Sequence, residues 1–219
     1  MRKMVMLALL LVGLTAQAQV FQKRSSEGSY SYLEEASERV AKGVKPFVKA
    51  NFVVSDYVGN YSGGQKELYG YAVEAGLQIP FSLRCLGLQT ALRYITKGSK
   101  VPLEEGSSSR NVVRQNTIEV PVLFTMFIPT GSTGGLKIGI GPYFSYGLSG
   151  KIETKDGDVN TFGTPGLDLN RPDMGMDMDV SWETRHFAAT MGIEAGFFKI
   201  RPGGFPRNRA FYMGVGYIF

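Results

Sequence analysis

The sequence of 219 residues predicts an all-β protein, a closed antiparallel up-and-down transmembrane β-barrel of about 8 strands. Three observations favour this fold. Large apolar residues recur at every second position over most of the chain, as in strands with two different faces. No stretch after residue 19 holds about 18 consecutive apolar residues, so no membrane-spanning helix is expected. Long and short connections between the strands alternate along the chain, which is typical of bacterial outer-membrane barrels.

The N-terminal segment is typical of an export signal. Arg2 and Lys3 precede an apolar run from Met4 to Leu14. The pattern Ala16-Gln17-Ala18 follows, with small residues at the positions that a signal peptidase reads. The run is too short to span a bilayer as a helix. We therefore expect residues 1–18 to form a signal peptide that is removed by cleavage after Ala18.

Two further regions are expected in the mature chain. Residues 19–42 should form a periplasmic N-terminal arm, in which only residues 32–40 have a helical pattern. Residues 43–219 should form the outer-membrane β-barrel domain, because the two-residue period starts there and continues to the end.

Eight alternating segments are the expected strands of the barrel. They are Val44–Val54, Tyr69–Phe81, Leu86–Tyr94, Ile118–Ile128, Leu136–Tyr146, Met174–Trp182, Phe187–Phe197 and Phe211–Phe219. The expected outer loops are 56–66, 97–114 and 149–172. An even number of strands would put both ends of the barrel domain on the periplasmic side.

The composition of the two strand faces predicts which face is inside. The less apolar face is mostly Gly, Ala, Ser and Thr, with one or two charges per strand, whereas a water-facing surface should be rich in Lys and Glu. The small residues should therefore line the lumen, and the apolar face should contact lipid. Candidates for interfacial aromatic girdles are Tyr69, Tyr94, Tyr146, Trp182, Phe197 and Tyr217.

The sparse charges of the small-residue face are nearly balanced, which predicts a lumenal charge network. Buried charges are tolerated when they are paired. The interior of an eight-stranded barrel is just wide enough for side chains to fill, so a closed lumen is expected rather than an open pore. The expected members of the network are Lys45, Lys49, Glu74, Arg93, Glu119, Lys137, Asp177, Asp179 and Glu194.

The composition also argues against several other classes of protein. Cys85 is the only cysteine and His186 the only histidine, so an internal disulfide is impossible and a histidine-based metal site is not expected. The net charge of +5 includes Arg2 and Lys3, and it is too weak to indicate a nucleic-acid partner. No cofactor and no metal are expected. The charges of Asp173, Asp177 and Asp179 should serve ion pairing rather than a metal.

The sequence favours neither a calcium-binding loop nor an enzyme active site. Residues 156–160 resemble the start of a calcium-binding loop, but Thr161 and Leu167 stand where that loop requires Gly and Glu. Enzymes among small outer-membrane barrels need a base, usually His. Strand parity puts His186 at a periplasmic turn, so no catalytic residue is expected.

The end of the sequence reads as an assembly signal. Phe211, Met213, Val215, Tyr217 and Phe219 form an apolar ladder that ends in an aromatic residue. Such a ladder resembles the signal that the barrel assembly machinery recognises on a last strand. This strand must also pair with the first one to close the barrel.

Four segments together resemble a known family. They are "GLQTALRYITKGSK", "TIEVPVLF", "GIGPYFSYGLSGK" and "PDMGMDMDVSW…MGIEAGFFKI". They are similar to the recurring segments of the PorT-type outer-membrane β-barrel proteins, over about residues 43–219. The matching stretches are Tyr94 with Lys97-Gly98, Ile118-Glu119-Val120-Pro121, Gly141-Pro142-Tyr143 and Asp173-Met174-Gly175, in which Met174 replaces the aromatic residue of the family pattern.

The resemblance implies an integral protein of the outer membrane, exported by its signal peptide. We expect a non-enzymatic structural or binding role through the outer loops, with a side-chain-filled lumen. One alternative is an accessory role in secretion or transport across the outer membrane, because one group of the family is linked to secretion. A second alternative is a lipid-modifying enzyme. Expected partners are outer-membrane lipid, the barrel assembly machinery and a periplasmic or extracellular protein, with no nucleic acid; the protein should be a monomer.

Overall fold

The computed structural model describes residues 43–59, 66–81, 85–102, 110–130, 134–154, 157–162, 169–200 and 207–219. The expected signal peptide and N-terminal arm lie outside these residues. The strands are β1 (Lys45–Val58), β2 (Leu68–Pro80), β3 (Leu86–Pro102), β4 (Arg110–Pro129), β5 (Gly134–Thr154), β6 (Gly157–Asn160), β7 (Pro172–Thr184), β8 (Phe187–Gly196) and β9 (Arg207–Ile218). In the described part of the chain, no helix has the length and hydrophobicity needed to cross a membrane.

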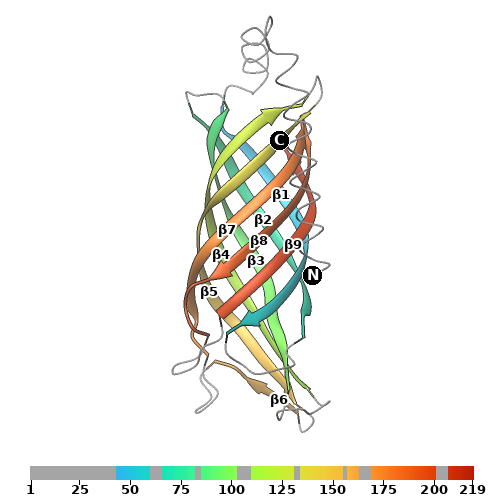
Figure 1. The fold of residues 1–219 in the computed structure, drawn as a ribbon, viewed down its shortest axis with the longest axis vertical. Helices are drawn as coiled ribbons and strands as arrows, with labels where there is room; N and C mark the ends of the chain where they lie inside the picture. Colours follow the sequence, from blue (N-terminus) through green and yellow to red (C-terminus); the bar gives the residue numbers. More distant parts are fainter. Residues whose placement is uncertain are drawn as a thin grey trace, which may run out of the picture. The chain divides into compact units, whose positions relative to one another are not determined.

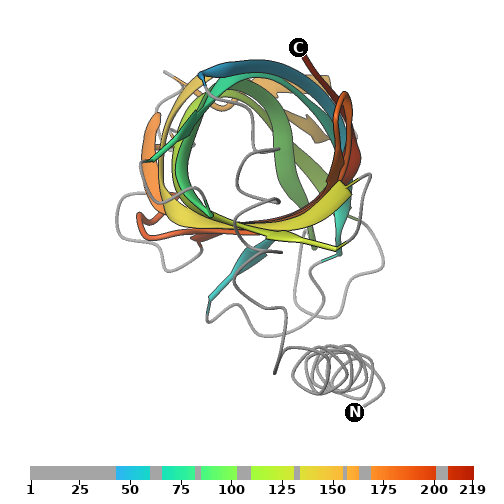
Figure 2. The ribbon, with the colours of Figure 1, turned by 90° about the horizontal axis from the view of Figure 1, so that it is seen from above.

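Eight of these strands close into a barrel. β1 pairs with β2 and also with β9, and each of the other neighbours pairs antiparallel around the ring. The pairing of β4 with β5 joins the two halves of the sheet. The strands are tilted against the long axis (Figure 1), and they form a closed ring in the view from above (Figure 2). The predicted all-β, closed antiparallel barrel is confirmed.

The barrel has two different ends. We call the end where β2–β3, β4–β5 and β7–β8 connect the short-turn end; β1 also begins there and β9 ends there. The opposite end, where β1–β2, β3–β4, β5–β7 and β8–β9 connect, is the long-loop end. The short strand β6 pairs with the last residues of β5 at the long-loop end and adds no strand to the ring.

The two-residue period of the sequence appears as an alternation of burial. On β1, Phe47, Lys49, Asn51 and Val53 are buried, whereas the residues between them point outward. The outer face is apolar all around the barrel. Its large side chains are exposed, up to 68% for Val215 and 62% for Phe124. A face of this kind requires an apolar surrounding, because soluble proteins do not expose continuous apolar surfaces of such extent.

Several strands are longer than the sequence predicted, above all β3, β4 and β5, and the expected outer loops are correspondingly shorter. β3 continues to Pro102, β4 starts at Arg110, and β5 continues to Thr154. Their ends are polar, and polar composition suggested loops. Strand segments beyond an apolar belt need no apolar outer face, so composition alone does not mark where they end. The strand β6 was not expected.

Two prolines interrupt the ladders of the barrel wall. The β3–β4 ladder pairs Thr90 with Val122 and resumes at Arg93 with Glu119. The β4–β5 ladder pairs Pro121 with Tyr143 and resumes at Phe124 with Ile140. Pro121 lies in the first gap and Pro142 in the second. Proline has no N–H to donate, so these positions cannot complete the ladder.

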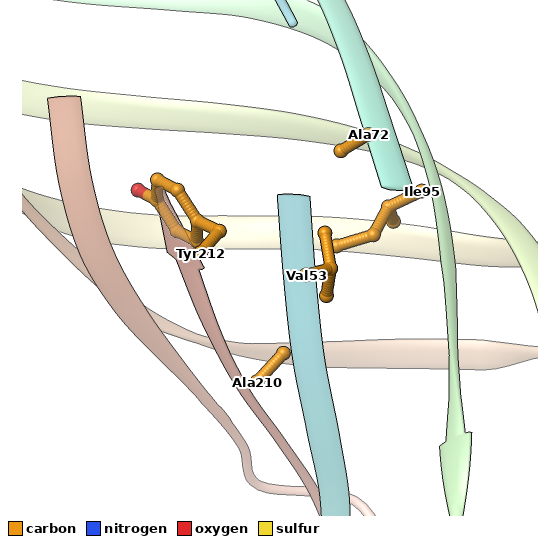
Figure 3. Packing of buried hydrophobic residues seen from close by; sticks show 5 residues of the cluster. All are labelled: Val53, Ala72, Ile95, Ala210 and Tyr212. Atoms are coloured by element: carbon orange, nitrogen blue, oxygen red, sulfur yellow. The ribbon is translucent and has the colours of Figure 1, made fainter. Parts of the chain in front are cut away.

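Buried apolar residues form three clusters inside the barrel. One is Val53, Ala72, Ile95, Ala210 and Tyr212, which lie on the adjacent strands β9, β1, β2 and β3 (Figure 3). A second is Phe47, Ala91, Ala188 and Ile218, toward the short-turn end. The third is Tyr57, Val113 and Ile200, against which Val101, Ile152 and Leu169 pack at the long-loop end. The third cluster, here named the apolar cap, covers that end of the interior.

Candidate functional site: the charged lumen

Polar and charged side chains fill the middle of the barrel, between the apolar clusters at its two ends. Each comes from an inward position of its strand, where the period of two places it. Arg93 on β3 is central. Its Nε lies 2.8 Å from Glu74 Oε2, and its Nη1 lies 3.0 Å from Asp177 Oδ2 and 3.4 Å from Glu194 Oε2. Glu119 Oε2 is 3.9 Å from the same Nη1. One guanidinium thus joins carboxylates from four strands.

Lys97 forms a second joint next to Arg93. Its Nζ lies 2.6 Å from Glu119 Oε1 and 3.0 Å from Glu194 Oε1. Lys97 was not among the expected members of the network, because residues 97–114 were expected to form a loop. The signal was present, since Lys97 continues the inward series of Gln89, Ala91, Arg93 and Ile95 at the same spacing.

A third group of charges lies toward the short-turn end. Lys49 Nζ is 3.4 Å from Glu74 Oε1 and 3.7 Å from Asp179 Oδ2. Lys137 Nζ contacts Glu183 and lies 2.6 Å from Gln89 Oε1. Glu183 continues the inward series of Asp177 and Asp179 on β7, but it was not among the expected members of the network.

Lys45 is the expected member that the structure leaves outside the network. It is half-buried at the first position of β1, paired in register with Gln78. Its ammonium has no ion pair within 4.0 Å among the residues that the structure describes. Lys45 lies outside the network because of its position along the barrel axis. The side chain starts at the edge of the barrel, two lumen positions below Lys49, and the apolar Phe47 stands between them.

Aromatic rings cover the cations of the network. The Arg93 guanidinium carbon is 4.7 Å from the centroid of the Tyr212 ring, and Lys97 Nζ is 5.1 Å from that of Tyr143. Tyr212 also donates its hydroxyl hydrogen to Asp177 Oδ1 at 2.8 Å. Ring faces attract cations, so these contacts add to the ion pairs. Sequence patterns did not reveal them, because the ring and the cation lie on distant strands.

The lumen contains more buried carboxylates than buried cations, so a single cation must pair with several carboxylates. The buried ionic side chains in the described interior comprise the cations of Lys49, Arg93, Lys97 and Lys137, and the carboxylates of Glu74, Glu119, Asp173, Asp177, Asp179, Glu183 and Glu194. With four cations for seven carboxylates, Lys49, Arg93 and Lys97 each bridge at least two acids.

Asp173 has a different task from the other buried carboxylates. It accepts hydrogen bonds from the backbone N–H of Met174 at 2.8 Å and of Phe198 at 3.3 Å, and from Asn208 Nδ2 at 3.0 Å. These donors lie on β7, after β8 and on β9. Asp173 therefore ties three strands together at the long-loop end, in the stretch that resembles the PorT-type pattern.

His186 and Cys85, the side chains that could act as a base or a nucleophile, lie away from the charged network. His186 stacks on Tyr217 at 5.7 Å between ring centroids, and its Nδ1 lies 3.1 Å from the carbonyl oxygen of Ile218. Both are at the short-turn end. Cys85 is exposed. Within the described ranges, no three His, Cys, Asp or Glu side chains are grouped so that they could hold a metal ion.

The apolar residues of the last strand lie on its outer face, as the sequence predicts. Phe211, Met213, Val215, Tyr217 and Phe219 are all exposed on the outer side of the barrel. The N–H of Phe219 donates to the carbonyl oxygen of Pro46 at 3.0 Å, and the Tyr217 and Phe219 rings are 5.1 Å apart. The proposed role of these residues in assembly stays a prediction.

The expected girdle residues lie on the outer face, at several heights. Trp182 and Tyr217 are near the short-turn end, whereas Tyr69, Tyr146 and Phe197 are toward the long-loop end. Tyr94 was expected at a strand end, and this is wrong. β3 continues eight residues beyond Tyr94, which is half-buried beside Tyr71 at 6.1 Å.

A family comparison agrees with a closed barrel that has an apolar outer face. Residues 17–201 match the family model of the outer membrane protein beta-barrel domain. The chain belongs to this family. The family implies an integral location in the outer membrane, where lipid can cover the exposed apolar face. No curated protein matches the chain.

Solved structures show barrels of similar fold. Neisserial surface protein A (NspA) has 11% sequence identity and a TM-score of 0.48, with 81% of this chain and 98% of that chain covered. The attachment invasion locus protein Ail of Yersinia pestis, solved with a heparin analogue, has 11% identity and a TM-score of 0.46, covering 81% and 100%. OprG of Pseudomonas aeruginosa has 10% identity and a TM-score of 0.45, covering 81% and 97%. At these values the similarity concerns the fold alone.

Proposed function

We propose that this protein is a non-enzymatic structural or binding barrel with a closed lumen, which presents its long-loop end to a partner outside the cell. The observation that supports this best is the charged lumen between apolar clusters. Arg93 and Lys97 bridge carboxylates across the interior, and the apolar cap covers the long-loop end. Because side chains close the interior in this proposal, the loops rather than a channel would contact the partner.

The long-loop end carries a sheet suited to such a surface. The ends of β3, β4 and β5 and the strand β6 pair side by side at the apolar cap. Val113 and Ile152 point into the cap, whereas Lys151 and Glu153 face outward and are exposed. Bacterial barrels place their long loops outside the cell. The sheet would hold a contact surface at a defined distance from the membrane.

The test is a comparison of binding to host or neighbouring cell surfaces with and without this sheet. Replacing residues 152–160 by a short glycine-containing turn should abolish binding and leave a folded barrel that shows heat-modifiable migration on gels. As a matched control, an insertion in the short turn at residues 131–133 should leave binding unchanged. Unchanged binding after removal of β6 would contradict the proposal.

A second candidate is an accessory role in secretion, as the PorT-type resemblance suggests. The matching stretches are parts of the described barrel, including Gly141-Pro142-Tyr143 in β5 and Asp173 at the start of β7. Deletion of the gene, followed by comparison of the secreted proteins, tests this role. The enzyme alternative rests on His186, and its test is a His186→Ala variant. Loss of a lipid modification in that variant would favour an enzyme.

A further inference from the structure

Two carboxyl groups of the lumen converge on the same cations. Glu119 on β4 and Glu194 on β8 each place one oxygen against Lys97 Nζ, at 2.6 and 3.0 Å. Their other oxygens lie 3.9 and 3.4 Å from a single nitrogen, Arg93 Nη1. The two carboxyl groups are also in hydrogen-bonding contact with each other. Ionised carboxylates only accept hydrogen bonds, so a hydrogen bond between two carboxyl groups requires a proton on one of them.

The network around this pair carries more negative than positive charge. Among the described residues, ion pairs join three cations and five carboxylates, which leaves a formal surplus of two negative charges; the members are Lys49, Arg93, Lys97, Glu74, Glu119, Asp177, Asp179 and Glu194. The adjacent pair of Lys137 and Glu183 is neutral and does not change this surplus. An uncompensated carboxylate is costly to bury, and it takes up a proton instead.

Glu119 is the member of the network that has room for a proton. Glu74 and Asp177 have close donors of their own, because Arg93 Nε lies 2.8 Å from Glu74 and the Tyr212 hydroxyl donates to Asp177 at 2.8 Å. Glu119 Oε2, in contrast, is fully buried, and the described residues offer it no hydrogen-bond donor within reach. This oxygen is therefore the free position for the proton.

Charged and titratable groups face the pair from the other strands of the barrel. They are Arg93 and Lys97 on β3, Asp177 on β7 and the Tyr143 hydroxyl on β5, followed by Glu74 on β2, Lys49 on β1 and the Tyr212 hydroxyl on β9. The cations favour ionised carboxylates, whereas burial and the neighbouring acids favour a protonated one. Because Arg93 is also shared with Glu74 and Asp177, it cannot fully compensate both members of the pair.

We propose that Glu119 and Glu194 hold one proton between them at neutral pH, as a hydrogen-bonded pair of one carboxylic acid and one carboxylate. Two carboxyl groups in such contact repel each other when both are ionised, and they titrate as a unit. β4 and β8 are not neighbours in the ring, so the pair connects two separate parts of the wall across the lumen. The proton becomes part of the closure of the lumen, and alkaline conditions weaken the barrel. This proton site is independent of the proposed partner surface at the loops.

The test measures the unfolding equilibrium of the full chain in lipid vesicles by urea titration between about pH 6 and 8. In the unfolded chain both side chains are ionised over this range, because an ordinary glutamate titrates at about pH 4.3. Unfolding then releases the shared proton, and one released proton raises the unfolding constant by up to about tenfold per pH unit. Over the whole range, the unfolding constant of the unmodified chain should rise at least about tenfold relative to that of Glu119→Gln. His186 titrates in both chains, so this ratio removes its contribution.

The variants separate a shared proton from an ordinary ion pair. Glu119→Gln keeps the shape of the side chain and donates a hydrogen bond as the acid does, so at pH 8 it should be at least as stable as the unmodified chain. Asp158→Asn, at an exposed carboxylate, is the matched control and should keep the full pH dependence. An equal pH dependence in Glu119→Gln, or a large loss of its stability at pH 8, would overturn the proposal. Loss of the pH dependence in Asp179→Asn alone would overturn it too, by assigning the proton to Asp179.

Infrared spectra of the unmodified chain decide the question if Glu119→Gln does not fold. A protonated carboxyl group gives a carbonyl band that is separate from the bands of carboxylates and shifts in D2O. This band should be present at neutral pH and disappear in strongly alkaline buffer. Its absence at neutral pH would contradict the proposal.

Discussion

Inside the barrel, Arg93 holds four carboxylates that come from four different strands. The side chain is 1% exposed, so water cannot replace these contacts. A buried ion pair contributes little compared with a well-packed apolar pair, but the loss of one partner leaves the other charge uncompensated. The consequence of a substitution at Arg93 is therefore larger than the strength of any one of its pairs.

The Arg93→Met variant should be strongly destabilised. Glu74, Asp177 and Glu194 would then lose their closest contacts to the guanidinium. We expect a loss of about 3–5 kcal/mol in the free energy of unfolding, measured by guanidinium titration in detergent or lipid vesicles. Lys151→Met provides the matched control, because its pair with Asp158 is exposed and contributes less than about 1 kcal/mol. Similar losses in the two variants would contradict the account.

A second prediction compares a cation of the lumen with a carboxylate. The surplus of carboxylates means that Glu74→Gln removes one charge from a site that keeps other acids, whereas Lys97→Met leaves two carboxylates without their shortest contact. Lys97→Met should cost at least about 2 kcal/mol more than Glu74→Gln in the same unfolding assay. A larger loss of unfolding free energy for Glu74→Gln would show that the carboxylates, rather than the cations, hold the network together.

The residues of the network differ in how far the sequence could predict them. Strand parity identifies the inward face, and it correctly separated Lys49 or Glu74 from the apolar neighbours that point outward. Strand parity does not give the position of a residue along the barrel axis, because that position depends on the stagger between strands. Lys97 was not predicted as a member of the network, because its neighbours in the sequence are polar and suggested a loop. Lys45 was predicted as a member although it lies at the edge of the barrel.

At the scale of single strands, the ladder gap at Pro121 is the clearest weak point of the wall. Lipid offers no hydrogen bond to an unpaired backbone group, so such a gap costs more there than at a water-covered edge. The Pro121→Val variant would restore an N–H to β4. It should raise the free energy of unfolding by about 1 kcal/mol, the net value of one hydrogen bond.

Guanidinium titration measures this change, with Pro46→Val at the short-turn end as the control. Pro46 lies next to the first residue of β1, where no interior ladder is interrupted. The control variant should change stability by less than about 0.5 kcal/mol. A loss of stability in Pro121→Val would mean that the packing of Pro121 beside the buried Tyr143 outweighs the hydrogen bond.

The last strand offers a prediction about assembly. β9 joins β8 and β1, and its outer face carries Val215, Tyr217 and Phe219. Charge on this face is costly in lipid. We expect Val215→Asp and Phe219→Ala to lower the amount of folded barrel in the outer membrane, measured by heat-modifiable migration and surface labelling. Tyr57→Phe, a conservative change in the apolar cap, is the control; normal surface levels of the β9 variants would refute the prediction.

The fold was predictable from the sequence at the scale of elements, with errors at their ends. The period of two, the short turns and the absence of a spanning helix were sufficient for the ring of eight strands. The ends of β3, β4 and β5 were missed, because outside the membrane a strand can be polar on both faces. The strand β6 has only four residues, too few for a periodic signal.

For the whole molecule, the central claim is that side chains close the lumen. Ionic bridges span its middle, and the apolar cap and the Phe47 cluster lie toward its two ends. An ion would have to separate paired charges at Arg93 and then pass apolar layers. Conduction through the barrel would require most of these contacts to break together.

Single-channel recording in planar lipid bilayers tests this claim most directly. The unmodified protein should insert without steady conductance. Heat-modifiable migration of the reconstituted protein should verify that it has inserted as a folded barrel. A steady open current from the unmodified protein would contradict the account.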